Sequence, residues 1–176
     1  MAQPVINKDK TVFRKASLAD VDVICGILRA AANRMLAEGK HQWDEYYPTR
    51  THVISDIESG IGYVIECHGD IVAYGAVVTE GEPLYAEIIG AWLSDGEYIV
   101  VHRMAVSQRA ERSGFGYMFL KSVEELAISQ GIKSFRIDTN FDNERMLGLL
   151  EKFGFRYCGE VMYENGAKLA FEKLLA

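Results

Sequence analysis

This sequence has few cysteines, no excess of basic charge and no long apolar run, and each shortage excludes a class of protein. The three cysteines are odd in number, widely spaced and free of any CxxC pair, so neither a disulfide framework nor a zinc site is expected. A net charge of −6 disfavours nucleic acid as the main partner, because phosphate binding needs a basic face. No stretch has the roughly eighteen consecutive apolar residues that a membrane-spanning helix requires.

No secretory signal peptide is expected at the beginning of the chain. Met1–Lys10 is polar and does not show the basic and then apolar pattern of a secretory leader. With 176 residues, 49% of them hydrophobic and 25% charged, the chain has the length and composition of one globular domain. We therefore predict a single cytoplasmic domain over residues 1–176, without a metal and without membrane or nucleic-acid partners. A homodimer is left open.

Apolar periodicity predicts alternating strands and helices. His68-Gly69-Asp70 has the composition of a hairpin turn, and Gly131 and Gly154 stand where two helices should end. The predicted strands are Thr11–Lys15, Gly62–Cys67, Ile71–Thr79, Tyr98–Val106, Ser134–Thr139, Phe155–Val161 and Lys168–Leu174, and the predicted helices are Ser17–Met35, Arg50–Ser59, Gly114–Gln130 and Asn143–Phe153. Residues 80–95 are left open between strand and loop. This order predicts an α/β fold with a mixed, mostly antiparallel central sheet and helices on both faces.

The most informative segment is the strand Val101–Val106, a polar stretch, and then Gly114-Phe115-Gly116 at the start of a helix. The first N–H groups of a helix lack intrahelical partners and carry partial positive charge, so they attract anions. Glycines let a bulky diphosphate approach the backbone, and Arg109 and Arg112 add positive charge nearby. The same glycines could serve as turn residues only, and this segment alone does not decide between the two interpretations.

The same glycines, with Asp138 further along, also match a dinucleotide-binding fingerprint superficially. Phe119 stands at the third glycine position and is too large for close helix–strand packing. The turn after the strand is too long, and neither a second mononucleotide half nor a Walker loop is present. A dinucleotide cofactor is therefore not expected.

Taken with a later segment, this region resembles the N-acetyltransferases of the GNAT superfamily. Val101–Val106 and Gly114-Phe115-Gly116 are similar to the family's motif A, and Asn143–Phe155 is similar to its closing segment. The resemblance covers residues 100–155 by motif. It implies a GNAT-type fold, acetyl-CoA as co-substrate, and direct attack by an amine without a covalent enzyme intermediate.

The resemblance also implies particular cofactor contacts. The strand backbone of Met104 and Val106 would bind the pantetheine arm, and Asn143 would lie near the sulfur. The pyrophosphate would be bound by loop and first-turn N–H groups, those of Arg112, Gly114, Gly116 and Tyr117. A strand N–H would polarise the thioester carbonyl.

Three positions depart from the family's pattern. Glu111 stands where Gln or Arg is usual, and its charge disfavours a pyrophosphate unless it points away or pairs with Arg109 or Arg112. Leu150 replaces the tyrosine that often protonates the leaving thiolate, and Val100 replaces a glutamate that is the base in some members. The usual acid and one usual base are therefore absent.

His102 is the predicted catalytic base. It precedes Met104 by two residues, which places both on one face of an ideal strand, and it resembles the histidine base of arylalkylamine-type members. An imidazole titrates near neutral pH and can take a proton from an ammonium group, whereas a purely structural histidine is the alternative. Arg103, on the opposite face, is expected to pair with a carboxylate such as Asp138.

The segment between the first two predicted helices is aromatic. The resemblance makes Gln42, Trp43 and Tyr46 part of the acceptor site, where aromatic faces with nearby carboxylates suit a cation; Trp43 could also anchor the loop in the core. We predict an acetyl-CoA-dependent N-acetyltransferase whose acceptor is a small primary amine. A catalytically weak acyl-CoA-binding module and a protein N-terminal or lysine acetyltransferase are the alternatives.

Overall fold

The computed structural model describes residues 7–176. Its strands are β1 (Thr11–Lys15), β2 (Gly62–Cys67), β3 (Asp70–Val78), β4 (Ile89–Gly90), β5 (Ile99–Val106), β6 (Ser134–Thr139), β7 (Arg156–Tyr163) and β8 (Gly166–Leu174). Its helices are α1 (Val21–Ala37), α2 (Arg50–Glu58), α3 (Phe115–Ser129) and α4 (Glu144–Phe153), with short 3-10 helices η1 (Leu18–Asp20), η2 (Pro83–Glu87) and η3 (Gln108–Ala110).

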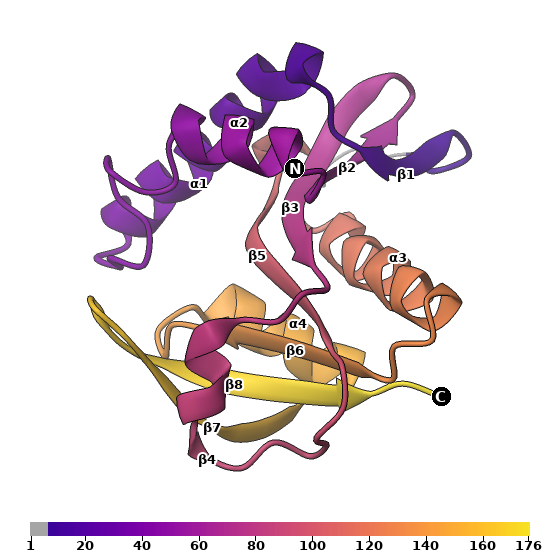
Figure 1. The fold of residues 1–176 in the computed structure, drawn as a ribbon. Coiled ribbons are helices and arrows are strands. Elements are labelled where there is room, and N and C mark those ends of the chain that lie inside the picture. Colours follow the sequence, from indigo (N-terminus) through magenta and orange to yellow (C-terminus); the bar gives the residue numbers. More distant parts are fainter. Residues whose placement is uncertain (1–6) are drawn as a thin grey trace. The chain divides into compact units, whose positions relative to one another are not determined.

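The strands form one eight-stranded sheet in the order β1-β2-β3-β5-β6-β8-β7-β4 (Figure 1). Strands β5 and β6 pair in parallel, whereas β1–β2, β2–β3, β6–β8, β7–β8 and β4–β7 are antiparallel. The predicted mixed, mostly antiparallel α/β fold is therefore confirmed. The segment that was left open, residues 80–95, contains η2 and the two-residue strand β4.

Several boundaries follow from local chemistry. Ser17 and Asp20 form a capping box at the start of η1, directly before α1, and Thr49 forms a second one with His52 before α2. The β2–β3 hairpin turns through His68 and Gly69, with φ of 52° and 83°, which is the backbone of a two-residue type I′ turn. These short-range signals explain why β1 and β2 begin and end where the sequence predicts.

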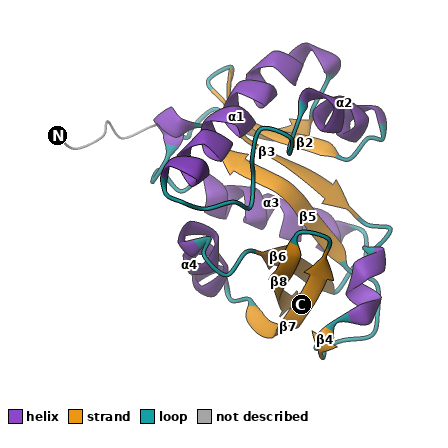
Figure 2. Cartoon of the chain, turned by 90° about the vertical axis from the view of Figure 1, so that its left-hand side faces the viewer, coloured by secondary structure: helices purple, strands orange, loops and turns teal. Residues whose placement is uncertain are grey.

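The chain folds into two compact units. The first comprises residues 1–76 and 103–119, described from residue 7 onward, and the second comprises residues 77–102 and 120–176. In the first unit, α1 and α2 lie side by side over β2 and β3 (Figure 2). The predicted apolar stripe of α1 is buried there, except that Cys25 is half-buried and Ile27 joins the core.

The second unit has its own core beneath η2 and the β7–β8 hairpin. Tyr85, Val100, Val161 and Ala170 are its buried members. A buried ion pair joins Arg136 to Glu172, whose carboxylate also accepts hydrogen bonds from two serine hydroxyls and a backbone N–H. The Glu172 side chain is fully buried and all its described partners belong to this unit.

Candidate functional site

The turn that opens α3 has the backbone geometry of an anion cradle. Arg112 and Gly114 have left-handed φ values of 61° and 83°, and the Gly114 carbonyl accepts the N–H of Met118 at 3.0 Å to start the helix. The backbone N–H groups that precede Met118 in this first turn have no carbonyl of the helix as a hydrogen-bond acceptor. Buried Phe115 anchors the turn in the first unit. Such a turn presents its N–H groups outward.

A lysine that sequence reasoning missed lies at this turn. The ammonium of Lys8 lies 5.2 Å from the centroid of the Phe115 ring. It also lies 2.8 Å from the point where a Cβ on Gly114 would stand, so a side chain at position 114 would have to displace it. Lys8 therefore adds positive charge at the start of α3 from a position more than one hundred residues earlier in the chain.

The carboxylate of Glu111, which is unfavourable beside a phosphate, pairs with Arg34 of α1. The sequence named Arg109 and Arg112 as cations that could compensate this charge, and the structure adds Arg34, which is distant in sequence. Arg109 instead pairs with Asp70 at 3.0 Å, with both side chains 62% exposed. The reason is tertiary: η3 contacts α1, so a residue distant in sequence is the nearer cation. The negative charge of Glu111 is thus compensated by Arg34, a residue of α1 that is distant from it in the sequence.

The strand β5 carries a backbone irregularity at Arg103, whose φ is +53°. Its guanidinium binds both carboxylate oxygens of Asp56, at 2.9 Å and 2.6 Å, and donates to the Tyr47 hydroxyl at 3.0 Å. The partner suggested from the sequence, Asp138, was therefore wrong. Asp138 instead accepts the hydroxyl groups of two tyrosines in the second unit. The missed signal was the place of Asp56 on the buried face of α2.

The irregularity at Arg103 also affects the argument for His102. A left-handed residue interrupts the alternation of side chains along a strand, so the two-residue spacing no longer places His102 and Met104 on a common face. The His102 imidazole instead has a partner of its own: Nε2 lies 3.2 Å from Oε2 of Glu82, with the two side chains 20% and 21% exposed. Sequence reasoning missed Glu82 because it lies in the segment that was left open.

The remaining predicted residues have local structural roles. Asn143 is the N-cap of α4, where its side-chain oxygen accepts the N–H of Met146 at 3.3 Å. Met104 and Val106 are half-buried in β5. Leu150 and Val100, at the positions of the usual acid and base, are fully buried. Neither position presents a proton donor or acceptor.

In the aromatic segment between α1 and α2, Trp43 is buried and Tyr46 is exposed. Trp43 is buried in the core of the first unit, whereas Tyr46 is 76% exposed and Gln42 is half-buried. The carboxylate of Asp44 holds the loop by accepting the N–H groups of Tyr46 and Tyr47 at 2.7 Å and 2.9 Å. The core-anchor interpretation describes Trp43, and an acceptor role for this loop stays a prediction.

A second polar group is buried in the second unit. Tyr85 and Tyr163 donate their hydroxyls to Oδ2 of Asp138 at 2.7 Å and 2.6 Å. Burial, followed by the charge of Asp138, raises the pKa of Tyr85 well above its usual range, so this hydroxyl stays protonated. Lys168 is only 9% exposed and lies 5.5 Å from the Tyr163 ring centroid. Burial lowers the pKa of Lys168, and the charges of Asp138 and Asp142 oppose that shift.

We expect Lys168→Met to stabilise the protein by about 1 kcal/mol at pH 7, because the variant no longer buries a charge. The lowered pKa means that the folded state loses this proton more readily than the unfolded state. The cost is therefore fully present below the folded-state pKa and disappears as the pH rises toward that of an unfolded lysine. Urea unfolding between pH 7 and pH 10 should show stability rising more steeply in the wild type than in Lys168→Met. Parallel curves would contradict the prediction.

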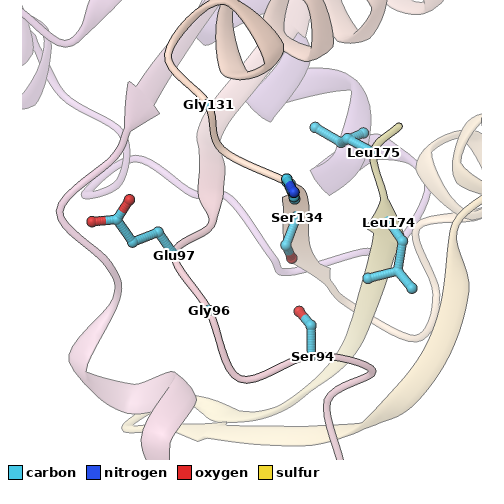
Figure 3. Close-up of a pocket in the computed structure, with 8 residues that line it drawn as sticks. Ser94, Gly96, Glu97, Gly131, Ser134, Leu174 and Leu175 are labelled. Carbon is cyan, nitrogen blue, oxygen red and sulfur yellow. The ribbon is translucent and has the colours of Figure 1, made fainter.

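A cavity of about 460 Å³ lies elsewhere in the second unit (Figure 3). Its lining includes Ser94 and Ser134, which bond the buried Glu172, and Leu174 and Leu175 at the end of the chain. None of the residues predicted to bind cofactor or acceptor lines it. We assign it no role in the reaction.

Metal binding and membrane spanning each require a particular arrangement of side chains. Among residues 7–176, no group of three or more histidine, cysteine, aspartate and glutamate side chains is placed to hold a metal ion. Over the same residues, no helix combines the length and the apolar character needed to cross a membrane.

Comparison with known proteins identifies the family. A GNAT acetyltransferase crystal structure from Streptococcus agalactiae is 31% identical, with a TM-score of 0.87 over 97% of this chain and 99% of that one. A GNAT acetyltransferase from Listeria monocytogenes is 21% identical, with a TM-score of 0.74 over 94% and 95% of the two chains. The structure of yncA from Salmonella typhimurium, solved with its cofactor acetyl-CoA, is 16% identical, with a TM-score of 0.68 over 96% and 95%.

The search of curated proteins found no match. The model of the acetyltransferase (GNAT) family matches residues 28–155, which is well over half of the chain. The matched region contains α2, β5, the turn that opens α3 and all of α4. The chain therefore belongs to the GNAT family of acetyltransferases.

Proposed function

We propose that this acetyltransferase moves an acetyl group from acetyl-CoA to the nitrogen of a small primary amine. The observation that carries the proposal is the turn before α3, where left-handed Arg112 and Gly114 precede a helix start beside the Lys8 ammonium. A pyrophosphate is stabilised by N–H donors, by the positive end of a helix dipole and by nearby cations, here Lys8 and Arg112. The fold likeness to yncA, which was solved with acetyl-CoA, supports the same cofactor.

The roles of individual residues follow from this assignment. The backbone of Met104 and Val106 would hold the pantetheine arm, and the N–H groups of Gly114, Gly116 and Tyr117 would hold the pyrophosphate. Asn143 would lie near the sulfur while its side-chain oxygen caps α4. The acetyl-CoA thioester supplies the activated acyl group.

Proton transfer is the part of the chemistry that the chain's own side chains perform. A primary amine is mostly protonated at neutral pH, so it must lose a proton before its lone pair can form the C–N bond. His102 is the proposed acceptor of that proton. The C–S bond then breaks, one of the two remaining N–H protons passes to the leaving sulfur through water, and the other stays on the amide nitrogen. Direct attack by the amine requires no nucleophilic cysteine, and burial raises the pKa of the Cys158 thiol.

The acceptor is proposed to lie against the loop that contains Gln42, Trp43 and Tyr46. Tyr46 is exposed, and an aromatic face near the carboxylate of Asp44 suits an ammonium group. Trp43 would then contribute by anchoring the loop in the core.

One observation favours a different function, a catalytically weak acyl-CoA-binding module. The residues at the usual acid and base positions, Leu150 and Val100, are fully buried hydrocarbons. Calorimetry with acetyl-CoA, together with an assay of free thiol released in the presence of small primary amines, separates the two functions. Binding with amine-dependent thiol release supports the acetyltransferase, whereas binding without release supports the module. Absence of binding would contradict both.

The ion pair between Arg34 and Glu111 gives a prediction about cofactor affinity. Arg34→Ala should weaken CoA binding by about tenfold, roughly 1.4 kcal/mol, because the Arg34 guanidinium no longer offsets the Glu111 charge beside the pyrophosphate. The double variant Arg34→Ala/Glu111→Gln should recover most of that affinity. Arg50→Ala, which removes an arginine from the exposed pair with Asp22, is the matched control and should change nothing. A loss that persists in the double variant, measured by calorimetry, would refute the electrostatic explanation.

A further inference from the structure

The ion pair between His102 and Glu82 involves a specific ring nitrogen of the imidazole. The ion-pair contact joins the ring nitrogen Nε2 to Oε2 of the Glu82 carboxylate, at 3.2 Å. Over residues 7–176, no other described side chain bonds either nitrogen of His102. Both side chains are about four-fifths buried, so their charges interact more strongly than they would in water.

Glu82 is held in place from several directions within the second unit. Its backbone N–H donates to the hydroxyl of Tyr98 at 3.0 Å, and its other carboxylate oxygen, Oε1, accepts the N–H of Leu84 at 3.3 Å as the N-cap of η2. Tyr98 in turn stacks against the buried Tyr85, with ring centroids 5.9 Å apart. Oε1 is thus engaged by the 3-10 helix while Oε2 faces the imidazole.

We infer that Glu82 is the positioning residue of His102, and that Nδ1 is the atom that accepts the proton from the acceptor amine. A lone pair on Nε2 would lie 3.2 Å from a carboxylate oxygen, so we assign the proton of the neutral imidazole to Nε2 and the lone pair to Nδ1. The carboxylate also stabilises the imidazolium once Nδ1 has taken a proton. This inference rests on the proposed function in so far as it concerns catalysis; the tautomer does not depend on it.

The proton balance is simple. One proton leaves the ammonium group of the acceptor and bonds to Nδ1, giving an imidazolium opposite the Glu82 carboxylate. The free amine lone pair forms the C–N bond as the C–S bond breaks, and the second proton of the nitrogen ends on the thiol. The imidazolium returns its proton to water, and Glu82 does not change its protonation state.

The test combines a spectroscopic and a kinetic measurement on the full chain. Nitrogen NMR of ¹⁵N-histidine-labelled protein, with the His102 signals assigned by their loss in His102→Gln, should show the Nε2–H form at high pH. In Glu82→Gln the tautomers should mix and kcat/KM should fall about tenfold, because the neutral amide no longer favours the proton on Nε2. The KM for acetyl-CoA should stay within about twofold of the wild type.

Tyr98→Phe is the control for a merely structural role, because it removes the backbone anchor of Glu82 and keeps the carboxylate. It should lower stability while leaving the Nε2–H form in place. An Nδ1–H form in the wild type would overturn the inference, and so would an unchanged tautomer in Glu82→Gln. If the Nε2–H form is found but no amine is acetylated, the proposed function fails while the assignment of the pair stands.

Discussion

Asp56→Ala is expected to lower the free energy of unfolding by about 3–5 kcal/mol, the largest stability effect that we predict. The Asp56 carboxylate is 5% exposed and binds the guanidinium of Arg103, itself 15% exposed, through both oxygens. It also accepts the hydroxyl of buried Tyr74. Burial and the Asp56 carboxylate raise the pKa of Tyr74 well above its usual range, so its hydroxyl stays protonated and needs a hydrogen-bond acceptor. Alanine would leave a cation and a hydroxyl buried together.

Urea unfolding at pH 7 measures the effect, and two further variants identify its cause. Asp22→Ala breaks the exposed pair with Arg50 and should change stability by less than about 0.5 kcal/mol. Asp56→Ala/Arg103→Met removes both charges and should recover a large part of the loss. A loss below about 1 kcal/mol in Asp56→Ala would mean that water reaches Arg103 and that the pair is not buried in solution.

Most of the fold could be predicted because its signals are local. The strands β1 and β2 and the end of α4 at Gly154, whose φ is 96°, follow from alternation and turn residues within a few positions of each other. The segment that contains η2 and β4 could not be predicted in this way. Strand β4 has two residues and pairs with β7 about seventy positions later, so its own sequence carries no period.

The polar partners of the candidate site were largely beyond prediction. For Glu111, the cations that the sequence suggests are its neighbours Arg109 and Arg112. The structure supplies Arg34, which lies 77 positions away. Glu82 was missed for the same reason: it lies 20 positions before His102, in the segment without a period. Residue types at a motif indicate the chemistry, whereas tertiary packing decides which charges are compensated.

His102→Ala is expected to lower kcat/KM by about 10²-fold at pH 7, the usual scale for loss of a general base. Raising the pH should rescue part of the activity, because more of the acceptor then arrives as free amine. CoA affinity should barely change, since Met104 and Val106 are proposed to act through their backbone.

The control is His68→Asn, which removes an exposed histidine from the β2–β3 turn and suits its left-handed φ of 52°. It should leave the pH profile and kcat/KM unchanged, so that the loss in His102→Ala is specific to the imidazole beside Glu82. A structural histidine predicts another pattern, in which stability falls, the pH profile keeps its shape and kcat/KM stays within a few-fold of the wild type. In that case proton transfer would pass directly from the ammonium group to water, and the enzyme would accelerate the reaction by positioning the amine against the thioester.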